Sequence, residues 1–274
     1  MELVFHQPTL PLSNYIELIT YYKDYQPGFS MERFLPDGGI DLVVDLTSVT
    51  KHIYDNESLT EIQSCNKAWI SGMRTEFITI QASAPASEMV VIRFRPGMAW
   101  SFVHLPVLEM KDRVIDAELV FGKEILKFRE QLLELPVASD KFKLAEEYLL
   151  QRIKNHTEVH PAIQYCIGQM QGYPSGNSVK KLAEKTGYSN KHLIAIFGKY
   201  AGLAPKQYER VIKFQQVVQL LENKPERVKW SGLALDCGYY DQAHFINEFK
   251  NFSGFNPKAY LEARGDFMNY IPVR

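Results

Sequence analysis

The stretch LALDCGYYDQAHFINEFKNFSGFNPKAY, residues 233–260, repeats the pattern of LAEKTGYSNKHLIAIFGKYAGLAPKQY, residues 182–208. Both stretches begin with Leu-Ala, reach a Gly-aromatic pair after three further residues, and end in Gly-x-x-Pro-Lys-x-Tyr. The copies lie 51 to 52 residues apart. A repeat of this length indicates one supersecondary unit that the chain uses twice.

Each copy has the features of two short helices joined by a tight turn. In the first copy, Ser178 is a good N-cap, and Gly187 can take the left-handed conformation at which the helix ends. The next helix turns Leu193 and Phe197 inward and ends at Gly202. Two helices joined by a short turn that contains glycine form a helix-turn-helix. The second copy has one extra residue in its turn.

The segment between the copies, PKQYERVIKFQQVVQLLENKPE at 205–226, predicts one long helix. A helix of roughly 18 residues spans about 27 Å. Adjacent major grooves on one face of DNA lie about 34 Å apart. A linker of this size therefore places two reading helices in successive grooves. A single copy would equally suit a helical hairpin that binds nothing, and the second copy favours DNA.

These residues resemble a known family. Residues from about 160 to 264 resemble the DNA-binding domain of the AraC/XylS transcriptional regulators, most specifically through the Gly-aromatic-x-Asp-Gln-x-His-Phe core and the Gly-x-x-Pro-x-x-Tyr ending. The front resembles the N-terminal module of one subgroup, through RFLPDGGIDLVVDL, WISGMRT and IRFRPGMAW. The resemblance implies a homeodomain-like tandem helix-turn-helix domain and a cupin-like front module, and it names no ligand.

The resemblance also implies contacts to DNA bases on the outward faces of the two reading helices. These residues are Lys191, Ile194, Ala195, Ala243, His244 and Asn247. The family often has Arg or Gln at such positions, because these side chains pair with guanine and adenine. Here Ile194 and Ala195 offer only apolar contact, for instance to a thymine methyl, whereas Asn247 is suited to adenine. The alternative for Ile194 is partial burial against the long helix.

Lysines at the helix starts and ends are candidates for contact with the DNA backbone. Lys206 and Lys258 each follow a proline at a helix start, where free N–H groups and the positive end of the helix dipole attract phosphate. Lys199 and Lys250, near the ends of the reading helices, are further candidates.

The front of the chain, to about Phe94, predicts a β-rich sandwich or barrel. GIDLVVDLT at 39–47 alternates apolar and acidic residues with the period of a half-buried strand. KAWISG, FITIQA and EMVVIRFRP predict further strands, and Asp37-Gly38-Gly39 predicts a turn. The fold class is therefore α+β, with a β-rich domain followed by an all-α domain.

From about Met98 to Lys154 the apolar period becomes helical. AELVFGKEILKFREQLLEL at 117–135 places five apolar residues near one stripe, namely Leu119, Ile125, Phe128, Leu132 and Leu133. The polar stretch NHTEVHP at 155–161 is the best candidate linker. We therefore expect an N-terminal sensor or dimerisation module with a helical connector at 1–154, and the DNA-binding domain at 160–264.

Composition is that of an ordinary globular protein of 274 residues with a formal net charge of -1. The charge is uneven, since residues 161–264 carry 14 Lys and Arg against 8 Asp and Glu. A basic C-terminal part on an acidic front indicates nucleic acid as a partner. Scattered surface charge is the alternative. The N-terminus lacks the pattern of a signal peptide, no apolar run suits a membrane span, and we expect a cytoplasmic protein.

Enzymatic and metal-binding functions find little support. His156 and His160 are four residues apart, but His160 precedes Pro161, which disfavours a helix there. The three cysteines, Cys65, Cys166 and Cys237, form no CxxC pair. No phosphate-binding glycine loop or nucleophile elbow occurs. We therefore expect no catalytic residues, no metal and no cofactor.

The sequence thus predicts a sequence-specific regulator of transcription that binds double-stranded DNA. Expected partners besides DNA are RNA polymerase, a small-molecule effector at the N-terminal domain, and a second copy of the chain, with no membrane. Two alternatives stay open. One is a ligand-independent, dimerising DNA-binding protein. The other is an enzyme of the DNA-repair type, whose mark would be a nucleophilic cysteine.

Overall fold

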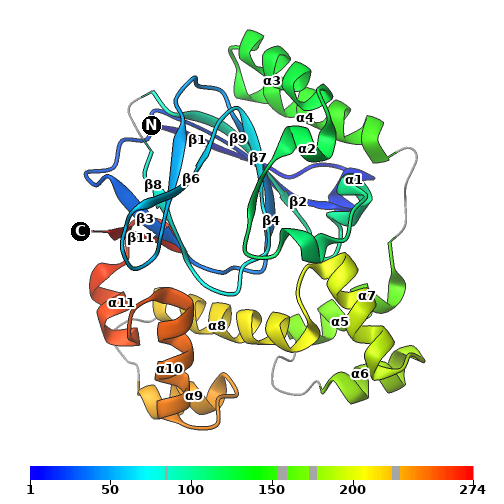
Figure 1. The fold of residues 1–274 in the computed structure, drawn as a ribbon, viewed down its shortest axis with the longest axis vertical. Coiled ribbons are helices and arrows are strands. Elements are labelled where there is room, and N and C mark those ends of the chain that lie inside the picture. The colour runs from blue at the N-terminus through cyan, green and yellow to red at the C-terminus, as the bar shows by residue number, and fades with distance from the viewer. Residues whose placement is uncertain (84–85, 154–158, 173–177, 224–228, 274) are drawn as a thin grey trace.

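The computed structural model describes residues 1–83, 86–153, 159–172, 178–223 and 229–273. The first part of the chain forms two antiparallel sheets, and the last part is helical (Figure 1). This arrangement confirms the predicted α+β class. Three expectations fall at least partly outside the described residues: the linker at 155–161 with His156, the break after the first C-terminal helix, and the last three residues of the long helix.

Two sheets make up the β-rich part. The larger sheet has the order β1 (Glu2–His6), β2 (Ile16–Lys23), β9 (Glu88–Phe94), β4 (Ile40–Asp45), β7 (Ala68–Ser71) and β10 (Val114–Asp116). The smaller sheet has the order β11 (Tyr270–Val273), β3 (Met31–Phe34), β8 (Ile78–Gln81), β5 (Lys51–Tyr54) and β6 (Glu61–Cys65). All four strands predicted from their alternation are present.

Both faces of the larger sheet are covered. One face packs against helices, which are η1 (Leu12–Asn14), α1 (Trp100–Val103), η2 (Val107–Met110), α2 (Ala117–Phe121), α3 (Glu124–Glu134) and α4 (Ala138–Ile153). The other face looks toward the smaller sheet. All six residues of β4 are consequently buried. The expectation of a half-buried strand was wrong, because the second sheet covers the side that carries Asp41, Val43 and Asp45.

The predicted helical stripe at 117–135 is broken in the structure. Gly122, with a φ of +66°, separates α2 from α3. Ile125, Phe128 and Leu132 are buried as expected, but Leu119 is 81% exposed and Leu133 is 42% exposed. Leu133 directly follows the buried Leu132 on α3, so it does not share the buried face of the helix. The stripe was wrong at Leu119 because the glycine changes the direction of the chain, so that the period of α3 does not extend back into α2.

Seven helices are described in the C-terminal part. They are α5 (Pro161–Gly172), α6 (Val179–Thr186), α7 (Asn190–Ala201), α8 (Pro205–Asn223), α9 (Trp230–Asp236), α10 (Gln242–Ser253) and α11 (Pro257–Ala263). Helix α8 has 19 residues, which corresponds to about 28 Å. It runs beneath the sheets, with α6 and α7 toward one end and α9 and α10 toward the other (Figure 1).

After α11 the chain returns to the β-rich part. Strand β11 pairs antiparallel with β3 at the edge of the smaller sheet, with Tyr270 opposite Phe34. The sequence analysis did not anticipate this strand, since residues after 264 belonged to neither expected domain. The C-terminal part is therefore joined to the sheets by backbone hydrogen bonds as well as by side chains.

Candidate nucleic-acid interface

Local chemistry sets the limits of the first helix pair. The Ser178 side chain accepts a hydrogen bond from the N–H of Lys181 and caps α6, which ends at Gly187 with a φ of +76°. The Ser189 side chain caps α7 in the same way, and Gly202 ends it with a φ of +83°. The predicted turn and helix ends are confirmed.

The second helix pair uses equivalent residues. Asp241 accepts a hydrogen bond from the N–H of His244 at 2.7 Å and caps α10. Gly238 and Gly254 both have positive φ angles, at +73° and +75°. The segment from Gly238 to the cap is one residue longer than the segment from Gly187 to Ser189. Each reading helix therefore starts from a capped N-terminus after a glycine turn.

Buried residues at equivalent positions set the orientation of each reading helix. Leu193 and Phe197 of α7, like Phe245 and Phe249 of α10, are fully buried. Because side chains three and four residues apart share a helix face, the opposite face of each helix points outward. All six predicted base-contact residues are exposed: Lys191, Ile194, Ala195, Ala243, His244 and Asn247. Ile194 is 43% exposed, so it is not sealed against α8. Its contact with DNA stays a prediction.

The four predicted backbone-contact lysines occupy different surroundings. Lys206 at the start of α8, Lys258 at the start of α11, and Lys250 on α10 are exposed. Lys199 is only partly exposed, and its Nζ lies 4.2 Å from the centre of the Trp100 ring. In this arrangement the Lys199 ammonium is engaged with the β-rich part through a cation–π contact.

Two ion pairs hold α10 and the end of α11 on α8. Arg210 of α8 binds the Glu248 carboxylate through Nε at 2.6 Å and a terminal nitrogen at 2.8 Å. Hydrogen bonding to Glu248 raises the pKa of Arg210 above its ordinary value. Glu222 accepts hydrogen bonds from Tyr260 at 2.9 Å and Arg264 at 3.2 Å. These arginines orient the helices, and both are already engaged within the protein.

Two exposed residues at the start of α10 were not predicted as contact residues from the sequence. Tyr240, in the turn before α10, is 86% exposed. Gln242 is the first residue of α10 and is also exposed. The Asp241-Gln242 pair of the second copy was the signal for Gln242. A glutamine directly after an N-cap lies at the start of the reading helix, which is the end that meets DNA.

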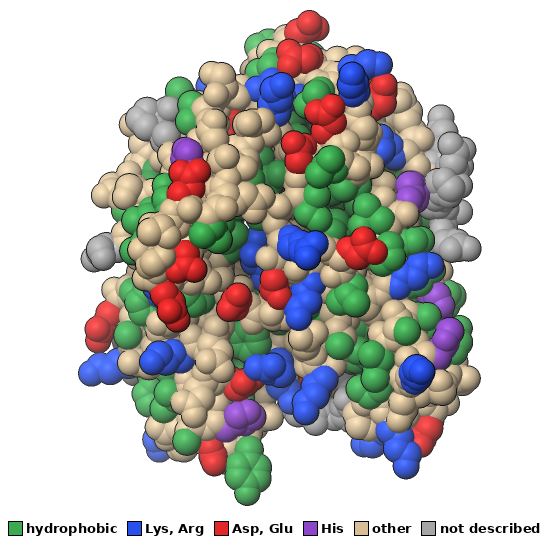
Figure 2. Space-filling view, viewed as in Figure 1, with side chains coloured by type: hydrophobic (Ala, Val, Ile, Leu, Met, Phe, Trp, Pro, Cys, Tyr) green, Lys and Arg blue, Asp and Glu red, His purple; other side chains and the backbone are tan. Residues whose placement is uncertain are grey.

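The C-terminal helical part forms two lobes, one with α6 and α7 and the other with α9 and α10. Figure 2 shows the lobes projecting from the lower part of the molecule, with a recess between them and Lys and Arg side chains on each. Helix α8 connects the lobes (Figure 1). A concentration of positive charge on both lobes favours a long anionic partner.

The described part of the chain shows neither a metal site nor an activated thiol at Cys65. Within these ranges, no group of three His, Cys, Asp or Glu residues is placed to hold a metal ion. Burial raises the pKa of Cys65 to about 11, so its thiolate is scarce at neutral pH. Among the described helices, none combines the length and the hydropathy needed to cross a membrane.

Two parts of the chain match known protein families. Residues 182–263 match a family described as a helix-turn-helix domain, and residues 4–116 match one described as a domain of unknown function, DUF6597. The multiple antibiotic resistance protein MarA of Escherichia coli is 32% identical over 83 residues, which are 30% of this chain and 64% of MarA. Residues 182–263 therefore form a helix-turn-helix domain similar to part of MarA. The matched domain comprises α6 to α11 almost entirely.

Further similarities extend over more of the chain. The uncharacterized HTH-type transcriptional regulator YbfI of Bacillus subtilis is 26% identical over 163 residues, 58% of this chain and 51% of YbfI. The chain thus spans less than two thirds of the length of either relative. The structure of ToxT from Vibrio cholerae is similar with a TM-score of 0.47 and 10% identity, covering 89% of this chain and 98% of ToxT.

Proposed function

We propose that this protein is a sequence-specific transcription regulator that binds double-stranded DNA, with α7 and α10 reading two successive major grooves. The observation that supports this proposal is that exposed residues occupy the same positions on both helices, counted from their N-caps. Lys191 and Ala243 are the second residues of their helices, and Ala195 and Asn247 are the sixth. Reading helices contact base edges through such N-terminal residues.

In this proposal, side chains divide into those that read and those that position. Asn247 and Gln242 are amides that suit adenine, whereas Ile194 and Ala195 suit a thymine methyl. Lys206, Lys250 and Lys258 bind phosphates and set the register without reading sequence. Lys199 joins them only when it leaves Trp100.

The β-rich part, residues 1–154, acts as the regulatory module and residues 160–264 as the DNA-binding module. The proposal assigns no catalytic chemistry to either part and places the protein in the cytoplasm. RNA polymerase and a second copy of the chain are the protein partners that it includes.

Selection of bound sequences from random duplex DNA with the full chain tests this function. We expect two short conserved boxes whose centres lie about one helical turn apart. A single box would restrict reading to one helix pair. Uniform recovery of all sequences at low and moderate salt would overturn the proposal.

A further inference from the structure

The space between the two sheets contains a cavity with two chambers that share lining residues. The inner chamber, of about 150 Å³, lies between the sheets, and the outer chamber, of about 580 Å³, opens beside β1, β2 and β11. Both chambers are lined by Tyr22, Glu32, Phe34, Asp41 and Tyr270. Cavities of several hundred cubic ångströms are typical of small-molecule sites.

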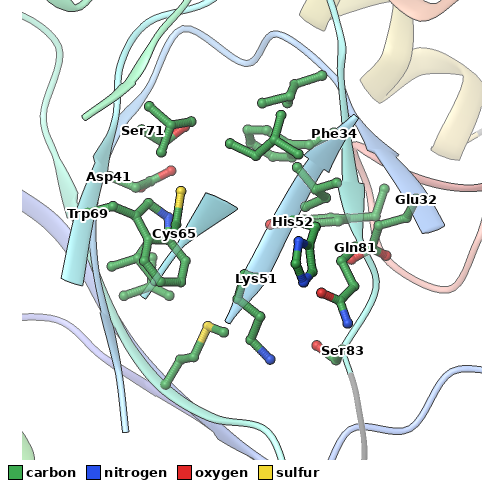
Figure 3. Close-up of a pocket in the computed structure, with 18 of the residues that line it drawn as sticks. Glu32, Phe34, Asp41, Lys51, His52, Cys65, Trp69, Ser71, Gln81 and Ser83 are labelled. Atoms are coloured by element: carbon green, nitrogen blue, oxygen red, sulfur yellow. The ribbon is translucent and has the colours of Figure 1, made fainter. Parts of the chain in front are cut away.

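Glu32 is the unusual group in this cavity. It is only 7% exposed, and it makes no ion pair and no side-chain hydrogen bond with any residue that the structure describes. Burial alone raises its pKa to about 7. On the same side of the cavity, the Oε1 atom of Gln81 is buried without a hydrogen-bond partner among the described residues (Figure 3). Buried acceptors left in this way are costly unless a partner arrives.

The cations of the cavity are already paired. Arg93 binds both carboxylate oxygens of Asp41, at 2.8 and 2.7 Å, and also contacts Asp37. Lys51 lies 3.3 Å from the Ser87 hydroxyl and 4.0 Å from Asp45. An anionic ligand would therefore meet engaged cations, whereas the Glu32 carboxylate has no counter-ion in the described part of the cavity.

Aromatic rings form much of the remaining wall. Phe34 and Tyr270 lie with ring centres 5.0 Å apart, on strands paired in register, so both rings lie on the same face of the sheet as Glu32. Trp69 stands on the opposite side of the inner chamber (Figure 3). Aromatic faces attract organic cations, and a desolvated carboxylate adds charge attraction.

The wall is also connected to the DNA-binding part. Tyr270 belongs to β11, and its neighbour Asn269 accepts a hydrogen bond from Gln215 of α8 at 2.9 Å. The same Gln215 nitrogen donates to the Pro36 carbonyl at 2.7 Å. Tyr270 is therefore linked through one residue to the helix that connects both helix-turn-helix pairs.

We propose that the cavity binds a small organic cation with an aromatic or alkyl body, that Glu32 is its counter-ion, and that β11 transmits its occupancy to α8. The coupling to DNA rests on the proposed function, whereas the binding of the cation does not.

Calorimetric titration of the full chain tests the binding. The probes are phenyltrimethylammonium and tert-butylbenzene, its uncharged isostere, with benzoate as the anion. We expect saturable binding of the cation only, and Glu32→Gln should weaken it at least tenfold. Glu147→Gln, which removes an exposed carboxylate of α4 outside the cavity lining, is the matched control and should change affinity less than threefold. Equal binding of the uncharged or anionic probe, or no effect of Glu32→Gln, would overturn the cation site.

The coupling is tested with one selected DNA duplex. Saturating phenyltrimethylammonium should change DNA affinity at least fivefold, and DNA should change cation affinity by the same factor. Asn269→Gly removes the acceptor for Gln215 and is tolerated by a backbone with a φ of +70°, so it should abolish the coupling and leave cation affinity intact. Asn269→Asp retains the acceptor and should retain the coupling. Unchanged DNA affinity would overturn the coupling. Absence of any DNA binding would instead contradict the proposed function.

Discussion

At the scale of single residues, burial decides the behaviour of Glu32. Its neighbours in the cavity are Tyr22 and the Asp41–Arg93 pair of the larger sheet, and Tyr270 of its own sheet. None of them supplies a free positive charge, so the carboxyl group favours its neutral form. A residue that costs stability when ionised and has no structural partner is typical of a functional site.

Glu32→Gln should therefore alter stability in a pH-dependent way. The folded-state pKa of about 7 lies above the ordinary 4.5, so the folded protein retains a proton that the unfolded chain releases. Stability is full below pH 4.5 and is lost as the pH rises to 7, by up to about 3 kcal/mol. We expect the variant to be more stable than the natural protein at pH 8, and no such gain at pH 4. Urea unfolding at both values measures this, and an equal difference at both would contradict the assignment.

Asn247→Ala should relax base preference at one position of the DNA site. A bidentate contact with adenine discriminates by about 1–3 kcal/mol. Competition binding with duplexes that differ at single positions measures the loss. Asn223→Ala, at the end of α8, is a control that should retain full preference. If Asn247→Ala weakens every duplex equally, this side chain contacts only the DNA backbone.

At the scale of elements, the two helix starts at Pro205 and Pro257 each carry an exposed lysine. The side chain of Asn256 accepts a hydrogen bond from the N–H of Ala259 at 2.9 Å, and the N–H of Lys258 has no intrahelical acceptor. A phosphate at either start would meet both the helix dipole and an ammonium group.

Lys206→Ala and Lys258→Ala should each weaken binding of all DNA sequences by a similar factor. Each lost phosphate contact should reduce the slope of log affinity against log salt by about one. Binding isotherms at several salt concentrations give the slope. Lys123→Ala, on the exposed surface near α3, removes the same charge far from the lobes and should leave the slope unchanged. An unchanged slope in the two test variants would exclude phosphate contact.

At the scale of the whole molecule, the core is continuous between the sheets and the C-terminal helices. Arg33 of β3 forms one of the connections, with its guanidinium 4.5 Å from the ring centre of Phe77 and 4.7 Å from that of Phe255. Gly38 forms another, because it lies beside the α8 side chains of Tyr208, Val211 and Ile212.

Arg33→Ala should loosen the attachment of α10 and α11 to the smaller sheet. The variant loses two cation–π contacts, each worth about 0.5–2 kcal/mol. Hydrogen exchange should become faster in the segment around Phe255, while the helices that cover the larger sheet stay protected. Arg113→Ala, at an exposed position of the β-rich part, is the control and should leave exchange around Phe255 unchanged. Unchanged exchange around Phe255 would show that the two cation–π contacts of Arg33 do not hold this attachment.

The sequence by itself determined the two helix-turn-helix units, because their signals are local. Ser189 and Gly202 act on backbone groups within a few residues, and the spacing of Leu193 and Phe197 determines which face of the helix is buried. The tertiary structure alone decided that β11 pairs with β3, that Lys199 lies on Trp100, and that Glu32 has no counter-ion in the described part of its cavity. These outcomes depend on which distant surfaces cover each other. Residues 32 and 270 are far apart in the chain. No local sequence pattern predicts whether a residue that becomes buried will gain a partner in the folded protein.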